Sequence, residues 1–179
     1  RVRRDDDSYD GTVIRGWSDA SFNRRGEHSP YGGGYVEFNF AGVYWGARLL
    51  KFKPLAASES EVAAIVWITK QGMFVMELAA DMLHVQQGPF ELMTDSQAGR
   101  DIIVNQGATK HTVHFERWLY YARDMFLRRK MKPTFVPTEL MRADDKTKVV
   151  HKSKLFFCRK HQMNLRDDDS MCVTCVKKV

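Results

Sequence analysis

The sequence has few of the features that mark membrane-bound or secreted chains. No uninterrupted apolar run reaches the ~18 residues that a membrane-spanning helix needs, so we expect no membrane partner. Residues 1–7 read RVRRDDD and contain no apolar core, which excludes a secretory signal peptide. The chain also does not begin with methionine, and we expect it to be a piece of a longer protein.

Cysteine is scarce as well. The three cysteines all follow position 157, which does not fit the disulfide framework of a secreted domain. We therefore expect a reducing, intracellular environment. With one histidine the cysteines form a C-x-x-H and a C-x-x-C pair, a spacing that suits a small tetrahedral zinc site: Cys158, His161, Cys172 and Cys175. Free thiols in a loose tail are the alternative.

The composition is that of a globular domain. A chain of 179 residues with 44% hydrophobic residues can bury a core, and we expect one domain over residues 11–157. Residues 1–10 are predicted to be a flexible connection and residues 158–179 a C-terminal tail. The net charge of +6 favours a polyanionic partner such as nucleic acid.

The hydrophobic pattern predicts an α/β fold. A first strand is expected from the run at 11–15 to about Asp19, and two more at 35–40 and 43–49 with a turn at residues 41 and 42. A long helix is predicted from Ser58 to near residue 88, then a strand at 90–94 and a helix at 96–104. A helix at 114–130, a strand at 132–137 and a last helix from about Ala143 complete the order. This order predicts a five-stranded mixed sheet, antiparallel and then parallel, flanked by helices.

Four carboxylates fall where this topology brings strand ends and helix starts together. Asp19 and Asp95 end predicted strands, whereas Glu61 and Asp144 lie near the starts of predicted helices. Four clustered carboxylates cannot all stay ionised without a compensating cation. Magnesium prefers oxygen ligands, and two such ions can activate a water and stabilise the leaving oxygen of a phosphodiester.

Each of these residues also has a local structural explanation. Asp19 suits a turn after a strand. Ser58 and Glu61 have the spacing of a capping box. Asp95 or Ser96 fits the N-cap of one helix, and Asp144 or Asp145 that of another. The joint pattern nevertheless favours a shared metal site over separate structural roles.

Several short motifs carry a family resemblance. They follow one another in the order WSDAS at 17–21, YGGGYV at 31–36, ASESEVAA at 57–64, TDSQA at 94–98, TKH at 109–111, FVPTE at 135–139 with AD at 143–144, and KLFFCR at 154–159. Together, over about residues 11–165, they resemble the ribonuclease H domain of copia-type retrotransposon polyproteins.

The resemblance implies a ribonuclease H-like fold and an endonuclease that cuts the RNA strand of RNA–DNA hybrids with two magnesium ions. The family's acidic residues would map onto Asp19, Glu61, Asp95 and Asp144. Glu61 is chosen over Glu59 because the family's catalytic glutamate directly precedes an apolar residue and the helical run. Asp144 is followed by Asp145-Lys146 where the family usually has an apolar pair, so either aspartate is a candidate for the fourth ligand.

The resemblance also implies partners and an alternative. Such domains normally follow a reverse transcriptase, so we expect one upstream, in the cytoplasm, the nucleus or an element particle. The alternative is a degenerate domain that binds hybrid or a partner without cutting. Phosphate contacts would position the hybrid, with 2′-hydroxyl contacts discriminating RNA from DNA. The candidate substrate-binding residues are Arg24, Arg25, Ser96, Gln97, Lys110 and His111, and solvated surface charge is the alternative for the basic ones.

Overall fold

A five-stranded mixed sheet forms the centre of the protein. The computed structural model describes residues 13–22, 30–83, 88–105 and 116–165. The strands are β1 (Ile14–Ala20), β2 (Tyr31–Phe38), β3 (Ala41–Leu49), β4 (Phe90–Thr94) and β5 (Met131–Phe135). Their order across the sheet is β3-β2-β1-β4-β5, with antiparallel pairs β3-β2 and β2-β1 and parallel pairs β1-β4 and β4-β5. The predicted fold class is confirmed.

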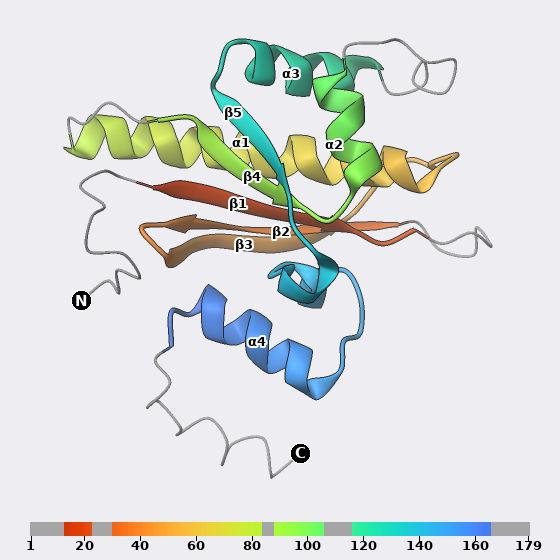
Figure 1. Ribbon diagram of the computed structural model, residues 1–179, viewed down its shortest axis with the longest axis vertical. Helices are drawn as coiled ribbons and strands as arrows, with labels where there is room; N and C mark the ends of the chain where they lie inside the picture. Colours follow the sequence, from red (N-terminus) through yellow and green to blue (C-terminus); the bar gives the residue numbers. More distant parts are fainter. Residues whose placement is uncertain (1–12, 23–29, 84–87, 106–115, 166–179) are drawn as a thin grey trace.

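Helices cover both faces of this sheet (Figure 1). The long helix α1 (Ala57–Leu83) packs on one face together with α2 (Gln97–Val104) and α3 (Glu116–Leu127). The other face carries two short 3-10 turns, η2 (Thr138–Leu140) and η3 (Asp144–Lys146), and then α4 (Lys152–Gln162). Because the strand residues alternate between the faces, the apolar core divides into a large cluster under α1 and a small one under η3.

Two glycines and one phenylalanine set the distance between α1 and the sheet. The ring of Phe90 in β4 lies between Gly16 in β1 and Gly72 in α1, and an ideal Cβ on either glycine would come within 2.3 Å of that ring. An alanine at either position would therefore overlap the ring. This close approach fixes the height of α1 above the strands, and with it the position of the side chains in its first turns.

A buried ion pair holds the chain on the opposite face. Arg142 Nη1 lies 2.8 Å from the Glu37 carboxylate, which is almost fully buried, and the Arg142 guanidinium stacks 4.4 Å from the Trp17 ring. Trp17 and Tyr35 pack there against Met141 and Ala143. The residues that flank Arg142 are thereby held against the sheet immediately before η3 begins.

Two predicted details of the chain path are wrong. The turn between β2 and β3 is at Asn39 and Phe40, both with positive φ, and residues 41 and 42 already belong to β3. Gly42 has a different role, because an ideal Cβ there would lie 2.3 Å from the carbonyl oxygen of Gln162 at the end of α4. The last helix, expected from about Ala143 with a possible break, is divided into the short turn η3 and, after a gap, α4, so only its first part differs from the prediction.

Helix α1 is long and apolar enough to cross a bilayer by length and composition alone. Half of its most apolar 18-residue window is buried inside the protein, against β1, β2 and β4. The core helix of a soluble α/β domain is buried in the same way, so the length and apolar composition of α1 are weak evidence for a membrane span.

One boundary of the predicted division of the chain, between the domain and the C-terminal tail, falls within the described residues. Helix α4 continues from Lys152 across the boundary expected between residues 157 and 158 and ends at Gln162. Residues 1–10 and most of the predicted tail lie outside the described residues. The division into a connection, a domain and a tail stays a prediction.

Replacing Gly72 by alanine is expected to destabilise the protein by about 1–3 kcal/mol, because the new methyl group overpacks against Phe90. Alanine is the better helix former by ~1 kcal/mol, so a loss of stability can come only from packing. Urea unfolding gives the free energy of unfolding. The second substitution Phe90→Leu should make the loss from Gly72→Ala smaller, and additive losses would contradict the proposed contact. Gly88→Ala, where no atom lies within 4 Å of the new Cβ, is the control.

Candidate functional site

The register of two parallel strands brings Asp19 and Asp95 to the same edge of the sheet. Ser18 in β1 pairs with Thr94 in β4, so the next residue on each strand is an aspartate at the carboxyl end of the pair. The carboxyl ends of adjacent parallel strands share one edge of a sheet. Asp19 is the next-to-last residue of β1. Asp95 follows the end of β4 and precedes Ser96, the N-cap of α2.

Glu61 reaches this edge from the first turns of α1. The helix begins at Ala57, so Ser58 lies inside it, and the alternative explanation of Ser58 and Glu61 as a capping box does not hold. Glu59 instead holds the segment that enters the helix, since its Oε2 accepts a hydrogen bond of 2.8 Å from the Leu55 backbone N–H. Glu61 is therefore free of a capping role and turns toward the two aspartates.

Three carboxylates consequently meet at one point. Ligand oxygens of Asp19, Glu61 and Asp95 lie within 4.8 Å of one another. Asp19 is buried, and Glu61 Oε2 is a buried oxygen without a hydrogen-bond partner. The sequence prediction that these residues converge is thus met by the geometry, from three separate elements.

The fourth candidate, Asp144, lies beside this group. It is the first residue of η3 and is 2% exposed, which makes it the most deeply buried of the acidic candidates together with Asp19. Gly33, which pairs with Asp19 across β1 and β2, makes this approach possible. An ideal Cβ on Gly33 would lie 2.6 Å from the Lys146 Cβ and 2.7 Å from the Thr147 Cγ2, so a side chain there would push η3 off the sheet.

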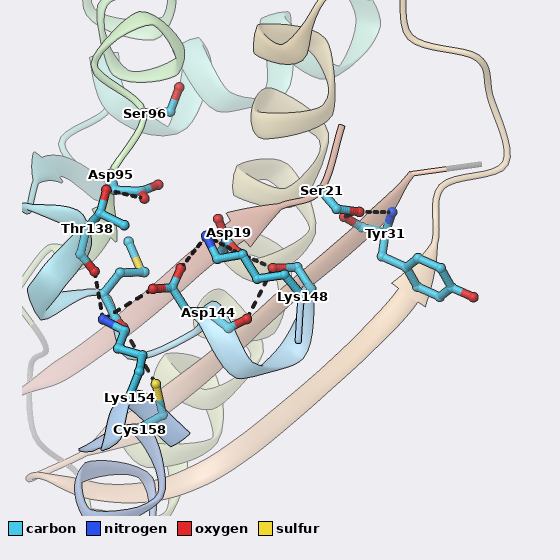
Figure 2. A network of polar contacts seen from close by, with 12 residues as sticks. Asp19, Ser21, Tyr31, Asp95, Ser96, Thr138, Asp144, Lys148, Lys154 and Cys158 are labelled. Carbon is cyan, nitrogen blue, oxygen red and sulfur yellow. Dashed lines mark hydrogen bonds and ion pairs between the residues drawn. The ribbon is translucent and has the colours of Figure 1, made fainter. Parts of the chain in front are cut away.

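The structure distinguishes Asp144 from Asp145. Asp144 faces the other carboxylates, and Lys148 Nζ contacts both Asp144 and Asp19 (Figure 2). Asp145 is held elsewhere, because its carboxylate accepts hydrogen bonds of 2.8 Å from Lys146 Nζ and from the Gln162 side chain. Of the two aspartates that the sequence left open, Asp144 is the one placed beside the cluster.

Sequence reasoning missed four side chains that complete the site. The Thr147 hydroxyl donates to Asp19, and the Thr138 hydroxyl donates to Asp95 Oδ2 at 2.9 Å (Figure 2). Lys148 and Lys154 form ion pairs with Asp144. Hydroxyls that orient carboxylates in this way commonly tune a metal site. No spacing in the sequence signals these contacts, because all four residues follow β5 in segments whose path depends on the Glu37–Arg142 pair.

The mutual approach of the carboxylates changes their protonation. Burial, together with the nearby charges of Asp19 and Asp95, raises the pKa of Glu61 to about 9. Burial also raises the pKa of Asp19 to about 6, although the Thr147 hydroxyl and Lys148 act against it. Buried carboxyl groups that lie close together have raised pKa values unless a cation beside them stabilises their ionised forms.

The donor set fits a hard divalent cation. All the ligand atoms in the cluster are carboxylate oxygens, which suit Mg²⁺, Mn²⁺ or Ca²⁺ rather than zinc. The partnerless oxygen of Glu61 is the observation that favours an ion, because a buried polar atom normally has a partner. A cation bound there would satisfy that oxygen and allow all three carboxyls to ionise.

The remaining predicted residues have mixed outcomes. Ser96 is the N-cap of α2 and accepts a hydrogen bond from the Gly99 N–H, while the Gln97 side chain donates to Asp101.

Of the predicted zinc ligands, Cys158 is buried in α4 next to the Met141 carbonyl. Burial raises the pKa of its thiol, which disfavours the thiolate that zinc binds. His161 packs against the Phe157 ring. The others lie outside the described residues: Arg24, Arg25, Lys110, His111, Cys172 and Cys175. The zinc site stays a prediction.

Comparison with solved structures shows the same arrangement of strands and helices elsewhere. The N-terminal RNase H domain of rv2228c from Mycobacterium tuberculosis matches 94% of this chain and all of its own, with 10% identity and a TM-score of 0.56. RNase H1 from Halobacterium salinarum matches 75% of this chain and 94% of its own, with 18% identity and a TM-score of 0.53. LC11-RNase H1, solved in complex with an RNA/DNA hybrid, also matches 75% of this chain with a TM-score of 0.53 and 11% identity.

Comparison with curated sequences adds a relative. The chain is 25% identical over 149 residues to the retrovirus-related Pol polyprotein from transposon TNT 1-94 of Nicotiana tabacum. The match covers 82% of this chain, which spans only 11% of the length of that polyprotein. No protein-family model matches the chain.

The fold and the sequence relative agree on one class of protein. Its five-stranded sheet with helices on both faces is the ribonuclease H fold. Its sequence relative is a retrotransposon Pol polyprotein, and the resemblance to a ribonuclease H domain of a copia-type element is confirmed.

The raised pKa of Glu61 predicts how the metal-free protein responds to pH. A carboxyl whose pKa rises on folding binds more protons in the folded state, so its contribution to stability is lost as pH rises from 4.5 toward 9. Glu61→Gln removes this loss. The free energy of unfolding of the variant, relative to the wild type, is therefore expected to increase across that range when both are unfolded by urea in the presence of a chelator. A difference that stays constant with pH would contradict the assignment.

Proposed function

We propose that the chain is a magnesium-dependent endonuclease that hydrolyses the RNA strand of RNA–DNA hybrids. The observation that carries the proposal is the convergence of Asp19, Glu61 and Asp95 from β1, α1 and the end of β4, with their oxygens within 4.8 Å. The ribonuclease H fold supports it, as does the hybrid bound to LC11-RNase H1 in its solved structure.

The acidic residues have separate tasks in this proposal. Asp19, Glu61 and Asp95 would hold one Mg²⁺, and Asp144 with Asp19 would hold a second. When bound, two such ions supply water activation and stabilisation of the leaving oxygen of the phosphodiester. Thr138 and Thr147 fix the orientation of Asp95 and Asp19 through their hydroxyls, so that the carboxylates are preorganised before substrate arrives.

The partner is an RNA–DNA hybrid, held by its backbone and recognised by its 2′-hydroxyl groups. The excess of 28 Lys and Arg over 22 Asp and Glu favours a polyanion. Because the sequence relative is a Pol polyprotein, we place the chain in a copia-type polyprotein that also carries a reverse transcriptase. The proposed location is inside the cell, where such an element copies itself.

A second candidate function has its own supporting observation. Asp144 is already neutralised by Lys148 and Lys154, which would disfavour metal binding at the fourth carboxylate. A domain of this kind could keep the fold and bind hybrid without cleaving it. Binding and cleavage therefore have to be measured side by side.

Replacing Asp95 by asparagine is expected to lower hybrid cleavage in Mg²⁺ by roughly 100-fold or more, because the cluster loses one anionic ligand while its shape is preserved. Cleavage is followed on a hybrid labelled on the RNA strand, with duplex DNA and single-stranded RNA as other substrates. Asp124→Asn is the matched control, since Asp124 is an acidic residue of α3 whose one ion pair among the described residues is with Arg128.

Three outcomes separate the candidates. Hybrid cleavage that is lost in Asp95→Asn and kept in Asp124→Asn supports the nuclease. Hybrid binding without cleavage by the wild type supports the degenerate domain. Equal cleavage by the wild type and Asp95→Asn would show a contaminating nuclease and overturn the assignment of the site.

A further inference from the structure

The ammonium group of Lys148 lies between two carboxylates of the site. Its Nζ is 2.7 Å from Asp144 Oδ1 and 3.7 Å from Asp19 Oδ2 (Figure 2). Lys148 is the second residue after η3 and lies four residues after Asp144, so the backbone that places the fourth carboxylate also places the lysine. The sequence resemblance gives no role to a residue at this position.

The positive charge near the four carboxylates is unevenly distributed. Both oxygens of Asp144 face a lysine, because Lys154 Nζ lies 3.2 Å from Oδ2. In the part of the chain that the structure describes, no ion pair reaches Glu61 or Asp95, and a buried oxygen of Glu61 has no hydrogen-bond partner. The lysines of the chain thus neutralise Asp144, whereas Glu61 and Asp95 have no such partner among the described residues.

The two lysines differ in how firmly they are held. Lys154 donates hydrogen bonds of 2.7 Å to the carbonyl oxygens of Thr138 and Glu139, and its side chain is 19% exposed. The Lys148 side chain is 43% exposed, and among the described residues its ammonium group forms ion pairs with the carboxylates of Asp19 and Asp144. Lys154 is therefore a fixed structural cation, whereas Lys148 can move into solvent without breaking other contacts.

An ion shared by Asp19 and Asp144 would need the oxygens that Lys148 contacts. A divalent ion and an ammonium group at this distance repel each other strongly, so both cannot be held there at once. We propose that Lys148 is a built-in cation that holds the position of the second metal ion between Asp19 and Asp144, so that the chain binds one divalent ion at Asp19, Glu61 and Asp95 and takes a second only when Lys148 leaves. This inference rests on the proposed metal-dependent function and deepens it.

The inference is tested by counting bound ions rather than by measuring activity. The full 179-residue chain is titrated with Mn²⁺, with free Mn²⁺ followed by electron paramagnetic resonance, and with Mg²⁺ in a calorimeter. The wild type is expected to bind one ion tightly and a second more weakly. Lys148→Met should raise the affinity for the second ion by roughly tenfold or more, with a smaller change at the first. Asp144→Asn should abolish the second ion and keep the first.

Matched variants make the result specific. Lys152→Met removes an exposed lysine near the start of α4 and should leave both affinities unchanged. Lys148→Gln serves as a second neutral variant, and Lys148→Arg, which keeps the charge, should retain the weak second ion. Circular dichroism confirms that each variant is folded.

Two failures can be told apart. If the wild type binds two ions with equal affinity, or if neither Lys148→Met nor Lys148→Gln strengthens the second ion, the role of Lys148 is overturned while the metal site stands. If the wild type binds no ion, or binds as well after Asp95→Asn, the proposed function itself fails.

Discussion

Electrostatic repulsion among three carboxylates at one edge of the sheet limits how this protein can be built. Asp19, Glu61 and Asp95 come from elements far apart in the chain, and their oxygens nevertheless lie within 4.8 Å of one another. Such a group is costly to bury unless positive charge or protons compensate it. The Thr147 hydroxyl and Lys148 stabilise the Asp19 carboxylate, and the raised pKa of Glu61 favours its protonated form, so part of this cost is met. The close packing of α1 through Gly72 and Phe90 keeps Glu61 beside the two aspartates.

The two faces of the sheet contribute differently to the site. The face under α1 has a large apolar core and positions Glu61 by close helix–strand packing. The face under η3 has a small core and relies on polar contacts: the Glu37–Arg142 pair, the stacking of Arg142 on Trp17, and the hydrogen bonds of Gln162. A buried ion pair gives specificity of placement more than net stability, which suits a segment whose task is to present Asp144 at a defined position.

Much of the fold and part of the site could be predicted from the sequence. Strand ends are visible in hydrophobic patterns, so Asp19 and Asp95 could be placed at one edge once a parallel pairing was inferred, and Glu61 followed from its place near a helix start. The end of the chain was harder. A helix with a possible break was expected from about Ala143, and its second part is α4, but the contacts of Arg142 and Gly33 hold the first part as the short turn η3. Gly42 suggested a turn, but it lies in β3, where the lack of a side chain lets the end of α4 pack closely against the strand. Lys148 and Thr138 could not be found, because their roles depend on that tertiary path rather than on local spacing.

The contact between Thr147 and Asp19 joins residues 128 positions apart, one of the longest separations along the chain in the described structure. Contacts of this kind close large loops and tend to form late in folding. During synthesis the carboxylates of β1, α1 and β4 emerge from the ribosome well before the segment that orients and partly neutralises them. A chain still being translated would therefore carry an incomplete group of carboxylates, because the segment that holds Asp144, Thr147 and Lys148 has still to dock against the sheet.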